Sequence, residues 1–293
     1  MKIKKGFFLS AILFIVFSLI LAGCTVKNTE KKSTEEKTTK EKSSTTTESS
    51  NDSTDGTTLT GDVNVIYLHH STGENIWNGG VPEYIEEYDS DNDTNYQIEE
   101  LAFPSDEYAW ENYPYDYWNI WVNHAGNSEY RGQPTLEMLT EDYDVISWKH
   151  CFPVGEIAED PGYSSVDDSN KTLANYQLQY NALKDKMHEF PNNKFVVWTG
   201  AALLQSETTP EQAQRTREFF TWVKNNWDEA GDNIYIWDFY ELETEGGIYL
   251  KNSYAEGDSH PNSSFSSKVA PYFGQRLVDV IEGKGDSGNI TGK

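Results

Sequence analysis

The sequence predicts an α/β protein with three layers, α/β/α, built around a mainly parallel sheet. Short apolar runs rich in β-branched residues recur along the chain and alternate with segments of helical spacing. Strands that alternate with helices favour right-handed crossovers and therefore parallel pairing. The first run, residues 63–68, is almost continuously apolar, which is typical of a strand covered on both faces.

Each element follows from a local pattern. Strands are expected at residues 63–68, 96–103, 144–151, 194–200 and 234–240. Helices are expected at residues 81–88, 134–141, 170–190, 210–228 and 263–281. Pro82 lies in the first turn of its helix, and Thr209 followed by Pro210 is the pattern of an N-cap and a first helical residue. The strand order is left open by the sequence.

The first 23 residues have the pattern of a targeting segment. Lys2, Lys4 and Lys5 precede an apolar run at residues 7–21, and the segment ends Leu-Ala-Gly-Cys. This ending resembles the lipobox of bacterial lipoproteins, which implies cleavage before Cys24 and lipidation of that residue. The alternative, an uncleaved membrane anchor, is disfavoured because the run is shorter than the roughly 20 residues a span needs. We therefore expect a protein anchored by lipid to the extracytoplasmic face of the cell membrane.

Composition divides the remainder into two parts. Residues 24–60 are mainly Ser, Thr, Lys and Glu, which cannot bury enough apolar surface to fold, so we expect a disordered tether. Residues 61–293 are long enough for one domain with a sizeable core. The net charge of −25 argues against a nucleic-acid partner. With Cys24 lipidated, Cys151 has no partner for a disulfide, and we expect it to be a small buried side chain rather than a nucleophile.

Three polar residues form the predicted active site. Ser71 follows the first strand, and Asp258 and His260 follow the last. Carboxyl ends of parallel strands meet at one edge of a sheet, where open α/β proteins bind ligands. A serine hydroxyl needs a base and a third group to orient that base. We predict that Ser71 is the nucleophile, that His260 is the base and that Asp258 orients it, with no metal or other cofactor.

These residues resemble the motifs of the SGNH (GDSL-type) hydrolases, namely a serine after the first strand and Asp-x-His-Pro-Asn before the last helix. The resemblance implies a flavodoxin-like sheet and an esterase, lipase or polysaccharide deacetylase activity. The family's acid lies three residues before the histidine, a place held here by Gly257, so Glu256 and a dyad without an acid stay open. Its third block has no counterpart. The candidates for oxyanion donors are therefore Ser71, Thr72, Gly126, Gly132 and Lys149.

The expected partner is an ester-bearing small molecule or polysaccharide. Residues 104–127 are rich in Tyr and Trp, which either pack a local core or offer flat rings to sugars. Acidic residues at 89–93 and Glu100 are spaced like a calcium loop but lack its central glycine, so an acidic turn is the favoured interpretation. Two alternative functions remain open. One is a glycan-binding lipoprotein without activity, and the other is a metal-dependent hydrolase using His69 or His70, His150, Asp258 and His260.

Overall fold

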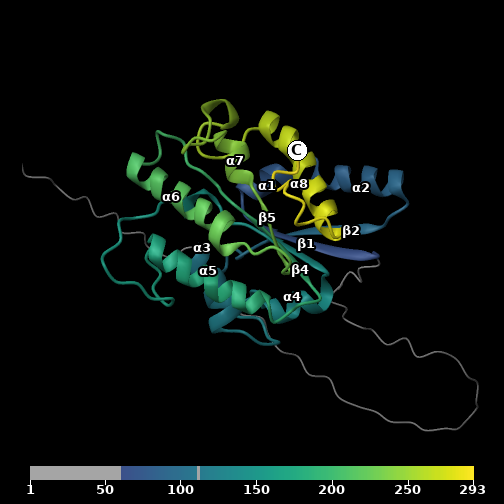
Figure 1. Ribbon diagram of the computed structural model, residues 1–293, viewed down its shortest axis with the longest axis horizontal. Helices are drawn as coiled ribbons and strands as arrows, with labels where there is room; N and C mark the ends of the chain where they lie inside the picture. Colours follow the sequence, from purple (N-terminus) through teal and green to yellow (C-terminus); the bar gives the residue numbers. More distant parts are fainter. Residues whose placement is uncertain (1–60, 111–112) are drawn as a thin grey trace, which may run out of the picture. The chain divides into compact units, whose positions relative to one another are not determined.

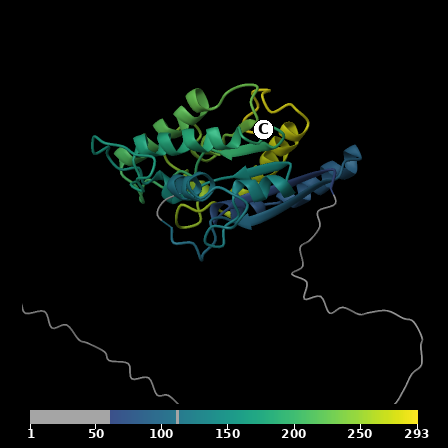
Figure 2. The same cartoon turned by 90° about the horizontal axis from the view of Figure 1, so that it is seen from below.

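The sheet is parallel throughout and has the strand order β2-β1-β3-β4-β5. The computed structural model describes residues 61–110 and 113–293, which lie in one compact unit, Asp55–Lys293. The strands are β1 (Val63–His69), β2 (Tyr96–Ala102), β3 (Val145–Trp148), β4 (Lys194–Trp198) and β5 (Ile234–Trp237). This confirms the predicted fold class, and the order 2-1-3-4-5 is that of flavodoxin-like folds. Figure 2 shows the blue α2–β2 end and the green α6 end at opposite sides of the sheet.

Helices cover both faces of the sheet. The helices are α1 (Thr72–Trp77), α2 (Val81–Asn92), α3 (Tyr113–Trp118), α4 (Leu136–Asp142), α5 (Leu173–Met187), α6 (Pro210–Trp222), α7 (Phe239–Thr244) and α8 (Ser263–Ile281). Short π- or 3-10-helical turns are η1 (Asn119–Asn123), η2 (Phe152–Gly155), η3 (Val223–Trp227) and η4 (Asn252–Tyr254). Helices α1, α2 and α8 lie on one face, and α3, α5 and α6 on the other (Figure 1).

The two cores follow from the alternation of side chains along the strands. In β1, Val65 and Tyr67 pack with α8 and its neighbours, whereas Ile66 and Leu68 pack with α3 and α5. Both sets are buried, which explains why the run reads as continuously apolar rather than alternating. The sheet is thus held between two apolar layers, and polar side chains collect where its strands end.

Most helices and strands lie close to their predicted bounds. Helix α8 has the bounds predicted, and α6 begins with a capping box in which Thr209 and Gln212 bond each other's backbone N–H groups. Three short helices were missed, one of which is α3 within the aromatic stretch. Helix α1 begins directly after Ser71, and α7 replaces the expected end of the fifth strand because the Asp238 side chain accepts a hydrogen bond from the backbone N–H of Glu241.

The aromatic stretch packs mainly into the interior. Tyr113, Tyr117, Trp118 and Trp121 are all buried against β1 and β3 on the α5 side of the sheet. Trp110 is the exception among these rings, with 37% of its surface exposed. The stretch is therefore mainly a local aromatic core, and one of its rings reaches solvent.

The acidic segment at residues 89–93 is not the turn expected from the sequence, because α2 continues through Asn92 and only Asp93 lies beyond it, as the left-handed C-cap. Asp89 accepts hydrogen bonds from the Thr94 hydroxyl and from the backbone N–H of Tyr96, and Glu100 is paired with His69. In residues 61–110 and 113–293, no helix has the length and apolar character needed to cross a bilayer. The predicted signal segment, Cys24 and the tether lie outside the described residues.

Candidate active site

The site forms where the order of the strands reverses direction. From β1 the chain crosses to β2 on one side, and β3 then pairs with β1 on the other side. The carboxyl ends of β1 and β3 therefore flank the crevice that such a switch point creates. Ser71 follows β1 and Cys151 follows β3, and the Ser71 Oγ lies 2.8 Å from the Cys151 Sγ.

A tight turn places Ser71 at the end of β1. The backbone N–H of Gly73 bonds the carbonyl of His70 at 2.7 Å. A Cβ atom at Gly73 would lie 2.4 Å from the Cβ of His69 and 2.5 Å from the Tyr67 hydroxyl, so only glycine fits this close approach. Ser71 itself is half-buried, and its hydroxyl points toward the end of β3.

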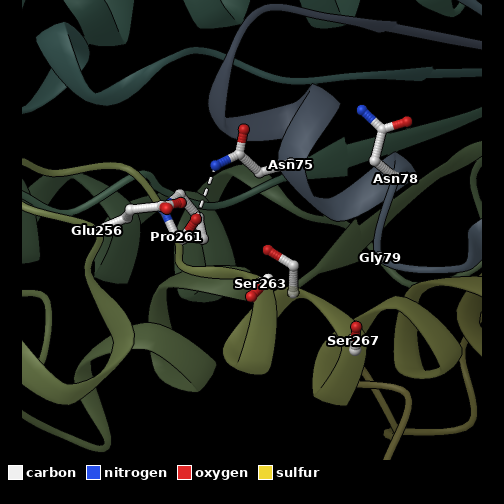
Figure 3. A pocket seen from close by; sticks show the side chains of 8 residues that line it. Asn75, Asn78, Gly79, Glu256, Pro261, Ser263 and Ser267 are labelled. Carbon is white, nitrogen blue, oxygen red and sulfur yellow. Dashed lines mark hydrogen bonds between the residues drawn. The ribbon is translucent and has the colours of Figure 1, made fainter.

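His260 lies on a loop that is tied down from three sides. The Asn75 amide on α1 donates to the carbonyl of Pro261 at 2.7 Å, a bond drawn in Figure 3. Ser259 is buried and its hydroxyl accepts from the backbone N–H of Leu204 at 2.9 Å. Asn262 caps α8 by accepting from the backbone N–H of Phe265 at 2.9 Å. These contacts fix the loop independently of the imidazole, which stays free to take part in chemistry.

Asp258 is the carboxylate that orients His260. Its Oδ1 accepts from the ring Nδ1 at 2.8 Å and from the backbone N–H of the same residue at 3.0 Å. Since Nδ1 is used in this way, Nε2 is the ring nitrogen left for the crevice. Glu256 contributes only its backbone N–H, which bonds the carbonyl of His260. An acid two residues before the histidine therefore does reach the ring.

The imidazole meets the sulfur of Cys151. A side-chain hydrogen bond joins His260 to Cys151, and the ring of Phe152 lies edge-on to the imidazole at 5.0 Å. The bond to Cys151 and the bond to Asp258 together raise the pKa of His260 to about 9, against the opposing effect of burial. At neutral pH the imidazole is therefore protonated.

Cys151 is a free thiol and is buried, with 3% of its surface exposed. Burial alone would raise its pKa, but the charge of Lys149 and hydrogen bonds from His260, Ser71 and the backbone N–H of Thr72 outweigh it and lower the pKa to about 5. The Thr72 hydroxyl lies 3.6 Å from the sulfur. The residue is buried as expected, yet its surroundings are those of a charged group and not of an inert apolar side chain.

Lys149 and Thr72 contact each other beside Ser71 and Cys151. Lys149 is buried, and its ammonium group donates to the Thr72 hydroxyl and to the carbonyl of His70 at 3.4 Å. Burial lowers the pKa of Lys149 to about 8, so most of its charge is present at neutral pH. Both residues, predicted as oxyanion donors, lie beside Ser71, and both act on the sulfur in this structure.

The two predicted glycine donors belong to another segment. Gly126 bonds the Glu137 carboxylate through its backbone N–H and the Thr135 hydroxyl through its carbonyl. Gly132 lies in the turn between Tyr130 and Gln133 at a φ of +73°. The contacts described for these two glycines thus keep them with the start of α4.

The histidines named in the metal-dependent alternative are dispersed. His69 donates to Glu100 at 2.7 Å, and burial lowers its pKa to about 3, so it stays neutral. His150 is fully buried among the rings of Tyr117, Trp148 and Tyr180. Within the described ranges, no group of three or more His, Cys, Asp or Glu side chains lies close enough to hold a metal ion.

Two small pockets adjoin the site. One, of about 230 Å³, is lined by residues after β1 and along β2, namely His69, His70, Ser71, Glu74, Glu100 and Ala102. The other, of about 210 Å³, lies between α1 and the start of α8 and is lined by amides, hydroxyls and Glu256 (Figure 3). Polar side chains line both, and Ser71 lines the first of them while Pro261, next to His260, lines the second.

Sequence reasoning found three members of this cluster and missed the fourth. Ser71, Asp258 and His260 were recognised because their residue types follow strand ends. Cys151 also follows a strand end, within Lys-His-Cys-Phe-Pro, and that position was the available signal. Lys149, whose charge lowers the pKa of Cys151, is only two positions before it, whereas the contacts from Ser71 and His260 come from about 80 and 109 positions away and are visible only in three dimensions.

Comparison with known proteins places the chain among distant structural neighbours only. No family model matches the sequence, and no curated protein matches it. An acetyl xylan esterase of known structure is 13% identical with a TM-score of 0.43, over 71% of this chain and 96% of that one. A gut microbial diltiazem-metabolizing enzyme is 9% identical with a TM-score of 0.45, over 78% of this chain and 48% of that one. At TM-scores below 0.5 these likenesses carry no argument, so the function is argued from the site.

Proposed function

We propose that this protein is a hydrolase that cleaves acyl esters through a covalent intermediate on Ser71. The observation that carries the proposal is the chain of contacts from Ser71 through Cys151 and His260 to Asp258, located at the topological switch point of the sheet. A nucleophile, a titratable partner within hydrogen-bond reach and an orienting carboxylate are the parts that acyl transfer needs.

In this scheme the Ser71 Oγ attacks the acyl carbon and the ester alcohol leaves, and water then releases the acyl group. Asp258 holds the imidazole of His260 so that Nε2 faces the crevice, and His260 moves protons in both halves of the reaction. The backbone N–H of Thr72 and the Thr72 hydroxyl lie within reach of the same point and supply donors for the oxyanion.

The surroundings favour a short acyl group on a polar alcohol, such as an acetyl group on a polysaccharide. The pockets are small compared with the 300–1,000 Å³ of typical small-molecule sites, and they are lined by polar side chains. Trp110 lies beside the pocket that His70 lines, with its ring 4.3 Å from that of His70 and 37% of its surface exposed. A partly exposed ring at the rim is suited to contact with the flat face of a sugar.

The proposed location follows from the sequence. We place the domain outside the cytoplasm, tethered through residues 24–60 to a lipidated Cys24. A lipid anchor and a flexible tether would bring an acidic domain to polymeric substrates near the cell surface. Metabolic labelling with a fatty acid, lost in Cys24→Ser, tests this part.

Labelling of the full chain by a fluorophosphonate tests the proposed nucleophile. The wild type should be labelled on Ser71 and should hydrolyse acetyl esters, whereas Ser71→Ala should lose labelling and at least about 10³-fold in kcat. Ser128→Ala, at an exposed serine remote in sequence, is the matched control and should behave as the wild type. Binding of glycans by a wild type without labelling or turnover would instead support the non-catalytic alternative.

A further inference from the structure

Cys151 is a nucleophilic group at the centre of the site to which the proposed function gives no role. Its sulfur lies 2.8 Å from the Ser71 Oγ and 3.6 Å from the Thr72 Oγ1, and it also bonds His260 and the Tyr113 hydroxyl. Donors from the start of α1, from the aromatic stretch and from the loop before α8 thus converge on one buried atom. Such a shell stabilises a negative charge on sulfur.

The charged groups around Cys151 favour a negative charge on its sulfur. Lys149 and His260 are cationic at neutral pH, whereas burial raises the pKa values of Tyr67 and Tyr113 and keeps both phenols neutral. Burial likewise raises the pKa of Glu243 well above its ordinary value, which favours the uncharged form of this carboxyl. Two cations therefore act on the sulfur and no fixed anion among these groups opposes them.

A thiolate beside an imidazolium changes which group can accept the proton of Ser71. His260 already carries its proton, so it cannot act as the base that the sequence predicted. The thiolate, in contrast, is in hydrogen-bond contact with the serine hydroxyl. We propose that Cys151 is the general base that takes the proton of Ser71, and that His260 is the general acid that protonates the departing alcohol. This inference rests on the proposed function and deepens it.

The step balances in protons and charge. As the Ser71 Oγ–carbon bond forms, the hydroxyl proton moves to the Cys151 sulfur and the carbonyl oxygen becomes an oxyanion. As the carbon–alcohol bond breaks, the proton on His260 Nε2 moves to the leaving oxygen. The thiol then returns its proton to the neutral imidazole, which restores the thiolate–imidazolium pair before deacylation repeats the sequence with water.

This assignment avoids a thiolate and an oxyanion being present in the site at the same time. The thiolate is neutralised while the oxyanion appears, so the N–H of Thr72 and the Tyr113 hydroxyl become free for the oxyanion when it forms. If the sulfur stayed ionised, two like charges would lie a few ångströms apart in a largely buried site, an arrangement that costs several kcal/mol at an effective dielectric near 20. Cys151 is also 3% exposed, while Ser71 is half-buried and nearer to solvent, which makes Ser71 the accessible nucleophile.

The test compares Cys151→Ser and Cys151→Ala with the wild type, all in full chains carrying Cys24→Ser so that position 151 holds the only cysteine. In the wild type, kcat/KM for p-nitrophenyl acetate should follow a bell between limbs near pH 5 and pH 9, set by the thiolate and the imidazolium. Both variants should lose about 10² to 10³-fold at neutral pH. Their acid limb should move up toward neutral pH, because His260 must then lose its proton to act as the base.

Two results would overturn the inference. One is a Cys151→Ser variant with the rate and pH profile of the wild type, which would make the sulfur structural. The other is an acyl or phosphonyl adduct on the sulfur instead of on Ser71, located by peptide mass spectrometry, which would make Cys151 the nucleophile. Alkylation of Cys151 by iodoacetamide at pH 6 reports the thiolate separately. If alkylation occurs but no ester is cleaved and Ser71 is not labelled, the proposed function fails and the base role fails with it.

Discussion

Replacing Lys149 by Met should raise the pKa of Cys151. The ammonium group donates to the Thr72 hydroxyl, and that hydroxyl lies 3.6 Å from the sulfur, so charge and sulfur are within about 7 Å when a hydrogen bond of about 3 Å is added. Two unit charges at about 7 Å interact by about 2 kcal/mol at an effective dielectric of 20. Because the pKa of Lys149 is about 8, its charge is fully present near pH 5, where Cys151 titrates. Its loss should therefore move the thiol midpoint upward by about one to two pH units.

The midpoint can be measured from the pH dependence of iodoacetamide alkylation, read at the Cys151 peptide by mass spectrometry. Lys194→Met is a matched control, because Lys194 is also partly buried and binds two backbone carbonyls, those of Val280 and Ile281 at 2.8 Å. It lies at the start of β4, at the amino ends of the parallel strands, whereas the site lies at their carboxyl ends. An unchanged or lower midpoint in Lys149→Met, with circular dichroism showing the fold retained, would refute the electrostatic account of the thiolate.

Three further substitutions probe other contacts. Asp258→Asn should lower the pKa of His260, which the alkaline limb of the pH profile will show. It should also reduce kcat by about 10- to 100-fold, a smaller loss than for a buried acid because the carboxylate is half-exposed. Trp110→Ala should raise KM for an acetylated polysaccharide by about tenfold (about 1.4 kcal/mol) and leave p-nitrophenyl acetate unaffected, which steady-state kinetics on both substrates will check. Glu243→Gln should become more stable relative to the wild type as the pH rises above about 4.5, the ordinary pKa of the carboxyl. Burial raises the pKa of Glu243, so the folded wild type loses stability as pH rises above the unfolded value, and thermal unfolding at several pH values measures the difference.

The layered fold could be predicted because its signals are local. Apolar runs of four to seven residues and a helical period on either side need no tertiary information, and α8 was placed at its observed bounds. The missed helices α1, α3 and α7 are six residues each, too short for periodicity to distinguish from a turn. The strand order was also beyond reach, since it depends on which runs pair and not on the runs themselves.

In the predicted site too, residues with a local signal were found and those that depend on tertiary packing were not. Ser71 and His260 carry chemistry that is recognisable from residue type, and Asp258 reaches Nδ1 because a two-residue spacing lets one carboxylate bind both the ring and the backbone N–H of His260. Gly126 contacts Thr135 and Glu137 at the start of α4, an association that spacing in the sequence does not reveal. Cys151 was underrated because buried cysteine is usually inert, and only its neighbours make it otherwise.

The proposed roles of Cys151 as base and His260 as acid follow from the charges that the two groups carry before substrate binds. Burial works against the charge of both groups, yet the bond between them favours the charged form of each, so the proton rests on His260 and the negative charge on Cys151. A site prepared in this way has a base and an acid on two different residues from the start, and does not need one imidazole to reverse its role within each acyl transfer. The cost is that any change that neutralises the pair, such as the removal of Lys149, should weaken both roles at once. The alkylation midpoint and the acid limb of the ester profile are therefore expected to move together, and independent movement would separate the sulfur from catalysis.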